Sequence, residues 1–131
     1  MSVVLDSWAI LRYLEDDGLA ADAVASLLAS ERPVMSWINL GEVYYVIHRV
    51  HGEVAATDTV RDLREVLTPD LRGATRMLDA ARIKAEHPLS YADAFAAATA
   101  VVLHAELWTG DPELLVADAP WRWRDLRRPV T

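Results

Sequence analysis

The chain has 131 residues, enough for one domain with a sizeable core, so a single domain over residues 1–131 is expected. The absence of cysteine excludes disulfides, thiolate zinc sites and cysteine nucleophiles. No apolar run reaches the roughly 20 residues that span a bilayer, and no signal peptide is apparent. These two observations favour a cytoplasmic protein. A net charge of −7 disfavours uniform binding to nucleic acid, although residues 72–84 and 119–131 are locally basic, with a balance of +3 each.

The first half of the chain alternates short apolar runs with segments of helical periodicity. The run "VVLD" at 3–6 predicts a buried strand that ends at Asp6, and "PVMS" at 33–36 predicts a second strand. Apolar residues recur at helical spacing from Trp37 to His51, and Gly52 is a plausible C-cap. The helices predicted in this half cover residues 7–14, 19–28, 37–51 and 54–65.

The second half continues the alternation. "VLTP" at 66–69 predicts a short strand, and a helix over about 71–86 is expected to end before Pro88. An alanine-rich helix follows over about 91–104, and "AELWTGD" at 105–111 predicts a strand that ends in an acid. The alternating "WRWRDL" at 121–126 fits a last strand with tryptophans inward and arginines outward, the alternative being stacking on nucleic-acid bases.

Strands that alternate with helices predict a mostly parallel sheet covered on both faces. In such sheets the functional site lies beyond the carboxyl ends of the strands. Asp6 and Asp111 fall at the ends of predicted strands, and Glu42 and Asp93 fall in early turns of helices near the same edge. A buried carboxylate needs a partner or a cation. Convergence of the four acids therefore predicts a metal site.

Each acid also has a simpler explanation. Asp6 fits an N-cap of the next helix, and Asp111 fits the opening of the turn "GDP". Asp93 lies in the first turn of a helix, where an acid favours the positive end of the helix dipole, and Glu42 fits a solvated helix face. Asp118 competes with Asp111 for the fourth place, with solvation in a loop as its alternative. Only convergence of several acids decides for the metal site.

Four segments carry a resemblance to a known family: "VVLDSWAIL", "SWINLGEVYY", "LSYADAFAAATA" and "LWTGDPELL". In this order they resemble the acidic blocks of PIN-domain ribonucleases, most closely the VapC-type toxins of type II toxin–antitoxin systems. The resemblance implies a three-layer α/β/α sandwich with a mostly parallel central sheet, a cofactor of Mg²⁺ or Mn²⁺, and endonucleolytic cleavage of RNA. It also implies a small VapB-like antitoxin as partner, a homodimer, and a heterotetramer or larger assembly with the antitoxin.

The resemblance also assigns residues. The metal-binding acids carried over are Asp6, Glu42, Asp93 and Asp111, and the polar residues matched beside them are Thr109 and Asn39. We expect Asp6, Asp93 and Glu42 to form the main metal site. Asp111 would complete the site through water or a second ion, and Thr109 would orient a water or Asp111. Hard divalent cations prefer oxygen ligands, which suits an all-carboxylate set.

The sequence also allows two other functions. A phosphate-transferring α/β domain also places acids at strand ends, but Lys84 is the only lysine and position 8 is Trp8 rather than a second Asp. A non-catalytic PIN-like protein-interaction module is the other alternative. His48 and His51 lie three residues apart on a predicted helix, but the sequence offers no matching third ligand, which favours solvent exposure.

Overall fold

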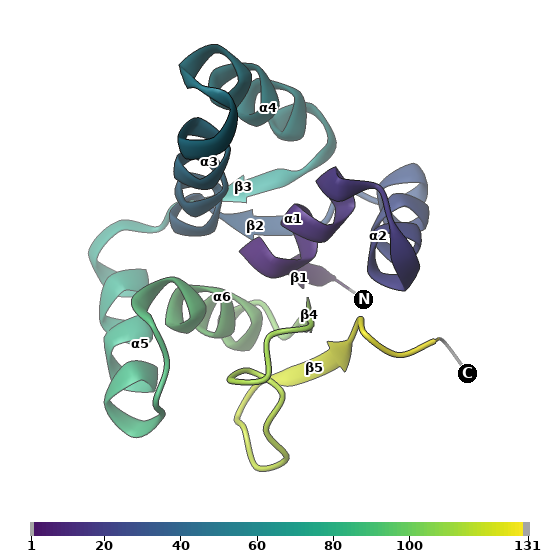
Figure 1. The fold of residues 1–131 in the computed structure, drawn as a ribbon. Helices are drawn as coiled ribbons and strands as arrows, with labels where there is room; N and C mark the ends of the chain where they lie inside the picture. Colours follow the sequence, from purple (N-terminus) through teal and green to yellow (C-terminus); the bar gives the residue numbers. More distant parts are fainter. Residues whose placement is uncertain (1, 130–131) are drawn as a thin grey trace.

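The structure is a computed structural model that describes residues 2–129, and its centre is a five-stranded parallel sheet (Figure 1). The strand order is β3-β2-β1-β4-β5, and every neighbouring pair is parallel. The strands are β1 (Val3–Leu5), β2 (Val34–Ser36), β3 (Thr68–Asp70), β4 (Glu106–Thr109) and β5 (Arg122–Asp125). The predicted parallel sheet is confirmed, and the carboxyl ends of all five strands share one edge.

Within residues 2–129, six helices lie in the connections from β1 to β4. They are α1 (Ser7–Glu15), α2 (Gly18–Ser30), α3 (Trp37–His51), α4 (Glu53–Val66), α5 (Gly73–Glu86) and α6 (Tyr91–Val102). Helix α3 has the predicted bounds, and Gly52 caps it at φ 92°, a left-handed conformation that favours glycine. No helix of residues 2–129 has the length and apolar character needed to cross a membrane.

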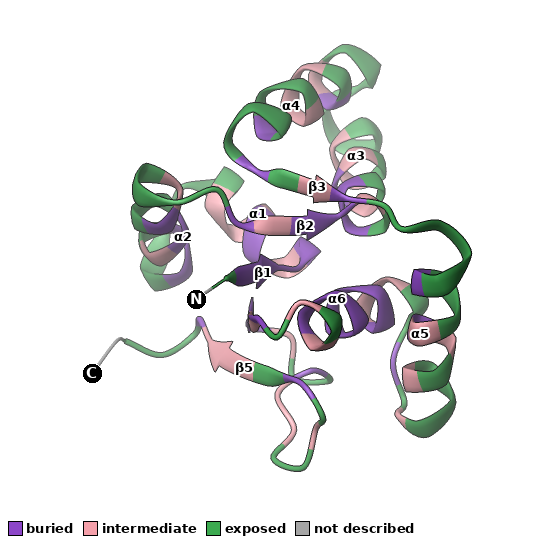
Figure 2. Ribbon diagram, turned by 180° about the vertical axis from the view of Figure 1, so that it is seen from behind, coloured by how far each residue is buried: buried purple, intermediate pink, exposed green. Residues whose placement is uncertain are grey.

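The helices cover both faces of the sheet, which gives the predicted three layers. Val3 and Leu5 of β1 pack in one apolar cluster with residues of α1 to α4, whereas Val4 packs in a second cluster with α5 and α6. Successive side chains of a strand point to opposite faces, so this split follows from the pleat. Figure 2 shows α6 as the most buried helix, in agreement with seven buried residues from Ala94 to Ala100.

Strand β3 begins later than predicted. The strand expected at 66–69 is present but shifted to Thr68–Asp70, because Val66 still belongs to α4 and the Leu67 N–H donates to the Leu63 carbonyl at 2.9 Å, which closes that helix. The strand ends instead at Asp70, a buried acid at the same edge as the candidate site. Asp70 is paired at 2.5 Å with the buried Arg76, so arginine rather than a cation compensates its charge.

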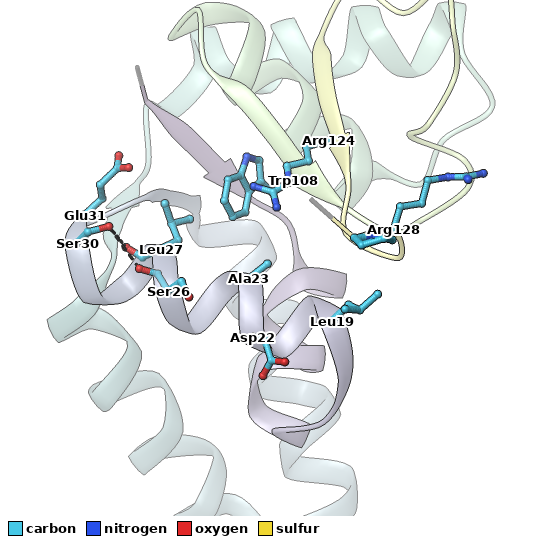
Figure 3. Close-up of a pocket in the computed structure, with 11 residues that line it drawn as sticks. Leu19, Asp22, Ala23, Ser26, Leu27, Ser30, Glu31, Trp108, Arg124 and Arg128 are labelled. Carbon is cyan, nitrogen blue, oxygen red and sulfur yellow. Dashed lines mark hydrogen bonds between the residues drawn. The ribbon is translucent and has the colours of Figure 1, made fainter. Parts of the chain in front are cut away.

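The C-terminal strand confirms the inward tryptophans. Trp121 is buried and its Nε1–H donates to the Leu114 carbonyl at 2.9 Å, while Trp123 donates to the Val116 carbonyl at 2.9 Å. Arg124 is only half-exposed, because its guanidinium lies 4.2 Å from the ring centroid of Trp108. Figure 3 shows this pair beside α2, at a cavity of about 490 Å³ that contains none of the acids predicted for the site.

Candidate functional site

A cavity of about 210 Å³ opens at the carboxyl edge of the sheet, and three of the four expected acids line it. Glu42 comes from α3, Asp93 from the first turn of α6 and Asp111 from the turn after β4, together with Trp8 of α1. Asp6, the fourth acid, is buried, and its carboxyl lies close enough to Asp111 and Glu42 to be affected by their charges. The structure thus brings the four acids together from four separate segments.

Asp6 is fixed on both of its oxygens. As N-cap of α1 its Oδ1 accepts a hydrogen bond from the Ala9 N–H at 2.9 Å, and its Oδ2 accepts one from the Thr109 hydroxyl. Burial, with only 1% of the residue exposed, raises the pKa of Asp6 from 3.8 to about 7. The charges of Asp111 and Glu42 raise the pKa further, against the two hydrogen bonds. Asp6 therefore caps a helix and also belongs to the acidic group.

Asp93 occupies the opening of α6, as the sequence predicts. Ser90 is the N-cap, and its Oγ accepts a hydrogen bond from the Asp93 N–H at 3.1 Å, which leaves the Asp93 carboxyl to the cavity. Burial raises the pKa of Asp93 to about 7, and the charge of Asp111, a hydrogen bond with it and the charge of Asp6 add to the effect. Without a cation, burial together with the neighbouring charges therefore makes Asp93 retain its proton up to near neutral pH.

Asp111 lies two residues beyond the end of β4, in a turn that fixes its carboxylate. Its N–H donates to Thr109 Oγ1 at 3.0 Å, and its Oδ1 accepts from the Glu113 N–H at 3.0 Å. The predicted role of Asp111 as a turn opener is therefore confirmed. Its carboxylate nevertheless faces the cavity with Asp93, so the turn holds a site residue in place.

Glu113 is an acid that the sequence analysis did not select. Carboxylate oxygens of Asp93, Asp111 and Glu113 lie within 4.8 Å of one another, and within residues 2–129 this is the one group of three acids or histidines so arranged. Asp6 and Glu42 are outside this group, so the predicted main trio of Asp6, Asp93 and Glu42 does not meet at one point. The signal for Glu113 was its place in the turn "GDPE", two residues after Asp111.

Asn39 joins the three helices that surround the site. Its Nδ2 donates to the Ala92 carbonyl at 3.0 Å and to Ser7 Oγ at 3.3 Å, and the Ser7 hydroxyl donates to the Asn39 carbonyl at 3.1 Å. Ser7 follows Asp6, Ala92 precedes Asp93, and Asn39 is three residues before Glu42. These contacts are long-range in sequence, so Asn39 sets helix positions rather than capping its own helix.

Thr109 provides a direct test of how the acids are fixed, since it donates to Asp6 and accepts from the Asp111 N–H. We expect Thr109→Val to lower Mn²⁺ affinity by about 10- to 100-fold, because both hydrogen bonds are lost while the side-chain volume is kept. Isothermal titration measures the affinity. Thr109→Ser retains the hydroxyl and should stay close to wild type; an equal loss in both variants would show that the hydroxyl does not matter.

Other candidates lie outside the cavity. Asp118 is exposed in the loop before β5, so its predicted alternative, solvation in a loop, describes it and it does not replace Asp111. His48 and His51 are exposed near the end of α3, and the ring of His48 contacts Tyr44 at a centroid distance of 5.8 Å. Neither histidine belongs to the group of acids described above.

The donor set of the cavity fits a hard divalent cation. All candidate ligands are carboxylate oxygens, and the structure shows no thiolate or imidazole among them. Mg²⁺ and Mn²⁺ prefer such oxygen ligands, and Mg²⁺ usually takes one or two carboxylates and keeps several waters. A positive charge at this place would also favour the charged forms of Asp6 and Asp93, whose pKa is raised by burial and by the neighbouring acids.

Solved structures share this fold over nearly the whole chain. VapBC-1 of nontypeable Haemophilus influenzae aligns with a TM-score of 0.75 at 21% identity, covering 98% of this chain and 100% of that one. VapC20 of Mycobacterium tuberculosis, described as a toxin that cleaves the sarcin-ricin loop, gives 0.67 at 22% identity and covers 86% and 92%. VapBC2 of Rickettsia felis, bound to a promoter DNA fragment, gives 0.75 at 14% identity and covers 95% and 98%.

Comparison with curated proteins gives no match, whereas comparison with protein families gives one that spans most of the chain. The PIN domain matches residues 3–120, a range that contains β1 to β4, all six helices and every acid of the cavity. The order of the strands and the acids at their carboxyl edge agree with this match. The chain belongs to the PIN domain family.

Proposed function

We propose that this protein is a metal-dependent endoribonuclease that uses Mg²⁺ or Mn²⁺ and acts as the toxin of a toxin–antitoxin pair. The observation that carries the proposal is that Glu42, Asp93 and Asp111 line one cavity, with the buried Asp6 and the exposed Glu113 beside them. A structural role alone does not account for the cluster, because burying the carboxyls of Asp6 and Asp93 beside other acids raises their pKa and destabilises the metal-free fold at neutral pH. Membership of the PIN domain family supports the same function.

Some residues would bind the cation, and others hold these ligands in place. The cation would be bound by Asp93, Asp111 and Glu113, since their oxygens lie closest together. Negative charge and places for bound water would come from Asp6 and Glu42. When bound, such a cation makes water a stronger nucleophile and stabilises charge on the phosphate that is attacked. Thr109 fixes Asp6, and the Glu113 N–H fixes Asp111, so the carboxylates are positioned before RNA arrives.

The proposed reaction is hydrolysis of an RNA phosphodiester bond. Water attacks the phosphorus, the bond from phosphorus to the 3′ oxygen breaks, and the products are a 5′-phosphate and a 3′-hydroxyl. The attacking water would lose its proton to a carboxylate of the site that does not bind the cation, and the departing 3′ oxygen would take up a proton from solvent water.

A partner protein follows from the similar structures, several of which are described as VapBC complexes. We propose that this chain binds a small VapB-like antitoxin in the cytoplasm and that the bound antitoxin blocks the acidic cavity. Expression of the chain alone in a bacterium should stop growth, whereas Asp93→Asn should not. Normal growth with abundant, folded wild-type protein would contradict the toxin role.

The test of the enzyme uses the purified chain, total cellular RNA and Mg²⁺, Mn²⁺ or EDTA. We expect new 5′-phosphate ends at a few sites with either metal and none with EDTA. Cleavage that persists in EDTA would contradict the metal mechanism. The absence of cleavage by folded protein that also binds no Mn²⁺ would favour a protein-interaction module.

A further inference from the structure

Gly110 lies between Thr109 and Asp111, two residues of the candidate site, and its environment leaves no room for a side chain. A Cβ atom built on Gly110 would lie 2.3 Å from Cη2, 2.4 Å from Cζ2 and 2.6 Å from Cζ3 of Trp8. Real Cβ atoms do not approach other atoms so closely. The backbone of Gly110 therefore rests directly on the six-membered ring of the Trp8 indole.

The backbone conformation does not require glycine at this position. In residues 2–129 the glycines with positive φ are Gly18, Gly52 and Gly73, so Gly110 adopts a conformation open to other residues. Trp8 alone explains the glycine. Glycine is required here by the contact with Trp8 and not by the backbone conformation. A smaller side chain at position 8 should therefore reverse the effect of a substitution at position 110.

Trp8 is held firmly enough to act as a fixed surface. It lies on α1 two residues after Asp6, and its ring is half-buried against the apolar cluster that contains Leu5 and Ile10. The Arg12 guanidinium lies 5.2 Å from the ring centroid and adds a cation–π contact. A ring with such contacts on the core does not withdraw freely, so a methyl group at position 110 would displace the backbone of the turn instead.

We propose that Trp8 is a positioning residue, whose indole sets the path of residues 109–111 and so the places of the Thr109 hydroxyl and the Asp111 carboxylate. The inference rests on the proposed function. Thr109 bonds both to Asp6 and to the Asp111 N–H, so one displacement of this turn moves all three groups relative to Asp93. Small shifts of groups that orient metal ligands cost about 10- to 100-fold in metal affinity.

The test compares wild type, Gly110→Ala, Trp8→Leu and the double variant. We expect Gly110→Ala to weaken Mn²⁺ binding by about 10- to 100-fold and to lower kcat for RNA cleavage with little change in KM. Trp8→Leu alone should lose less. In the double variant the smaller leucine leaves room for the methyl group, so the Mn²⁺ affinity should exceed that of Gly110→Ala. Such a rescue is not expected if residue 110 only affects general stability.

Gly41→Ala is the matched control. Gly41 also precedes a cavity acid, Glu42, but nothing lies within 4 Å of the Cβ built on it, so this variant should bind Mn²⁺ as wild type does. Thermal unfolding of every variant shows whether it is folded. Should Gly110→Ala not fold, Trp8→Leu decides, because the inference requires that it bind Mn²⁺ more weakly.

The outcomes separate this inference from the proposed function. Wild-type protein that binds no Mn²⁺ contradicts the metal site and, with it, the role of Trp8. Wild-type protein that binds Mn²⁺ while Gly110→Ala binds it within about twofold of wild type contradicts the role of Trp8 alone, since a misplaced ligand costs more than that. A double variant that binds no better than Gly110→Ala contradicts it too.

Discussion

We expect Asp93→Asn to lower the rate of RNA cleavage by about 1,000-fold or more while the protein stays folded, an increase of about 4 kcal/mol in the activation barrier. Asp93 belongs to the closest group of carboxylates in the cavity, with oxygens within 4.8 Å of those of Asp111 and Glu113. Asparagine keeps the shape and the helix position but removes the charge that holds a divalent cation. The hydrogen bond from the backbone N–H of residue 93 to the Ser90 Oγ does not involve the carboxylate, so this cap is kept.

Cleavage of a defined RNA substrate under single-turnover conditions measures the effect. Asp118→Asn is the control, because Asp118 has the same chemistry but lies exposed outside the cavity. It should cleave at the wild-type rate. Equal rates for Asp93→Asn and wild type, with both proteins folded, would remove Asp93 from the active site.

The second large effect concerns stability without metal. Folding raises the pKa of Asp6 and of Asp93 from 3.8 to about 7, so between these values the folded protein binds more protons than the unfolded chain. The free energy of unfolding therefore falls as the pH rises from about 4 to 7, by on the order of 2–4 kcal/mol. Asp125, whose pKa a hydrogen bond from Arg127 lowers to about 2, titrates below this range.

Asp93→Asn tests the cause of this loss. At pH 8 without metal the variant should be more stable than wild type by about 1–2 kcal/mol, less than the full pKa shift implies because Asp93 is partly open to solvent. Mn²⁺ at about 100 times its Kd should then stabilise wild type by about 2.7 kcal/mol and leave the variant unchanged. Urea unfolding at pH 5 and pH 8 measures both effects. A variant less stable than wild type at pH 8 would show that the half-buried charge of Asp93 does not cause the loss of stability.

The sequence predicts the architecture because the strands and helices differ in length and periodicity. The short apolar runs at 3–6 and 105–111 contain β1 and β4, and the repeat from Trp37 to His51 matches α3. Strand β3 was misplaced because its residues, Thr68 to Asp70, are polar or proline, and its pairing with β2 is a tertiary effect.

The candidate site was predictable only in part. Asp6 and Asp111 end or follow strands of the parallel sheet, so their meeting follows from topology. Glu113 is exposed in a turn, where most acids are merely solvated, and its only local signal is its place two residues after Asp111. The contact between Trp8 and Gly110 joins residues about one hundred positions apart, and neither residue signals the other.

A structural role for an acid, such as capping a helix or opening a turn, did not exclude a role in the candidate site. Asp6 caps α1 and Asp111 opens a turn, as their positions suggest, and both carboxylates still belong to the acidic group. Capping a helix or opening a turn fixes the position of a carboxylate, so no additional residue is needed to hold it in the site. The local structure therefore positions the acids proposed to bind the cation.

Anomalous diffraction from crystals soaked in Mn²⁺ would locate the cation without reference to activity. We expect a peak in the cavity, bonded to carboxylate oxygens of Asp93 and Asp111 and absent in Asp93→Asn. A cavity without a peak, or Mn²⁺ bound instead at His48 and His51, would contradict the proposed metal site.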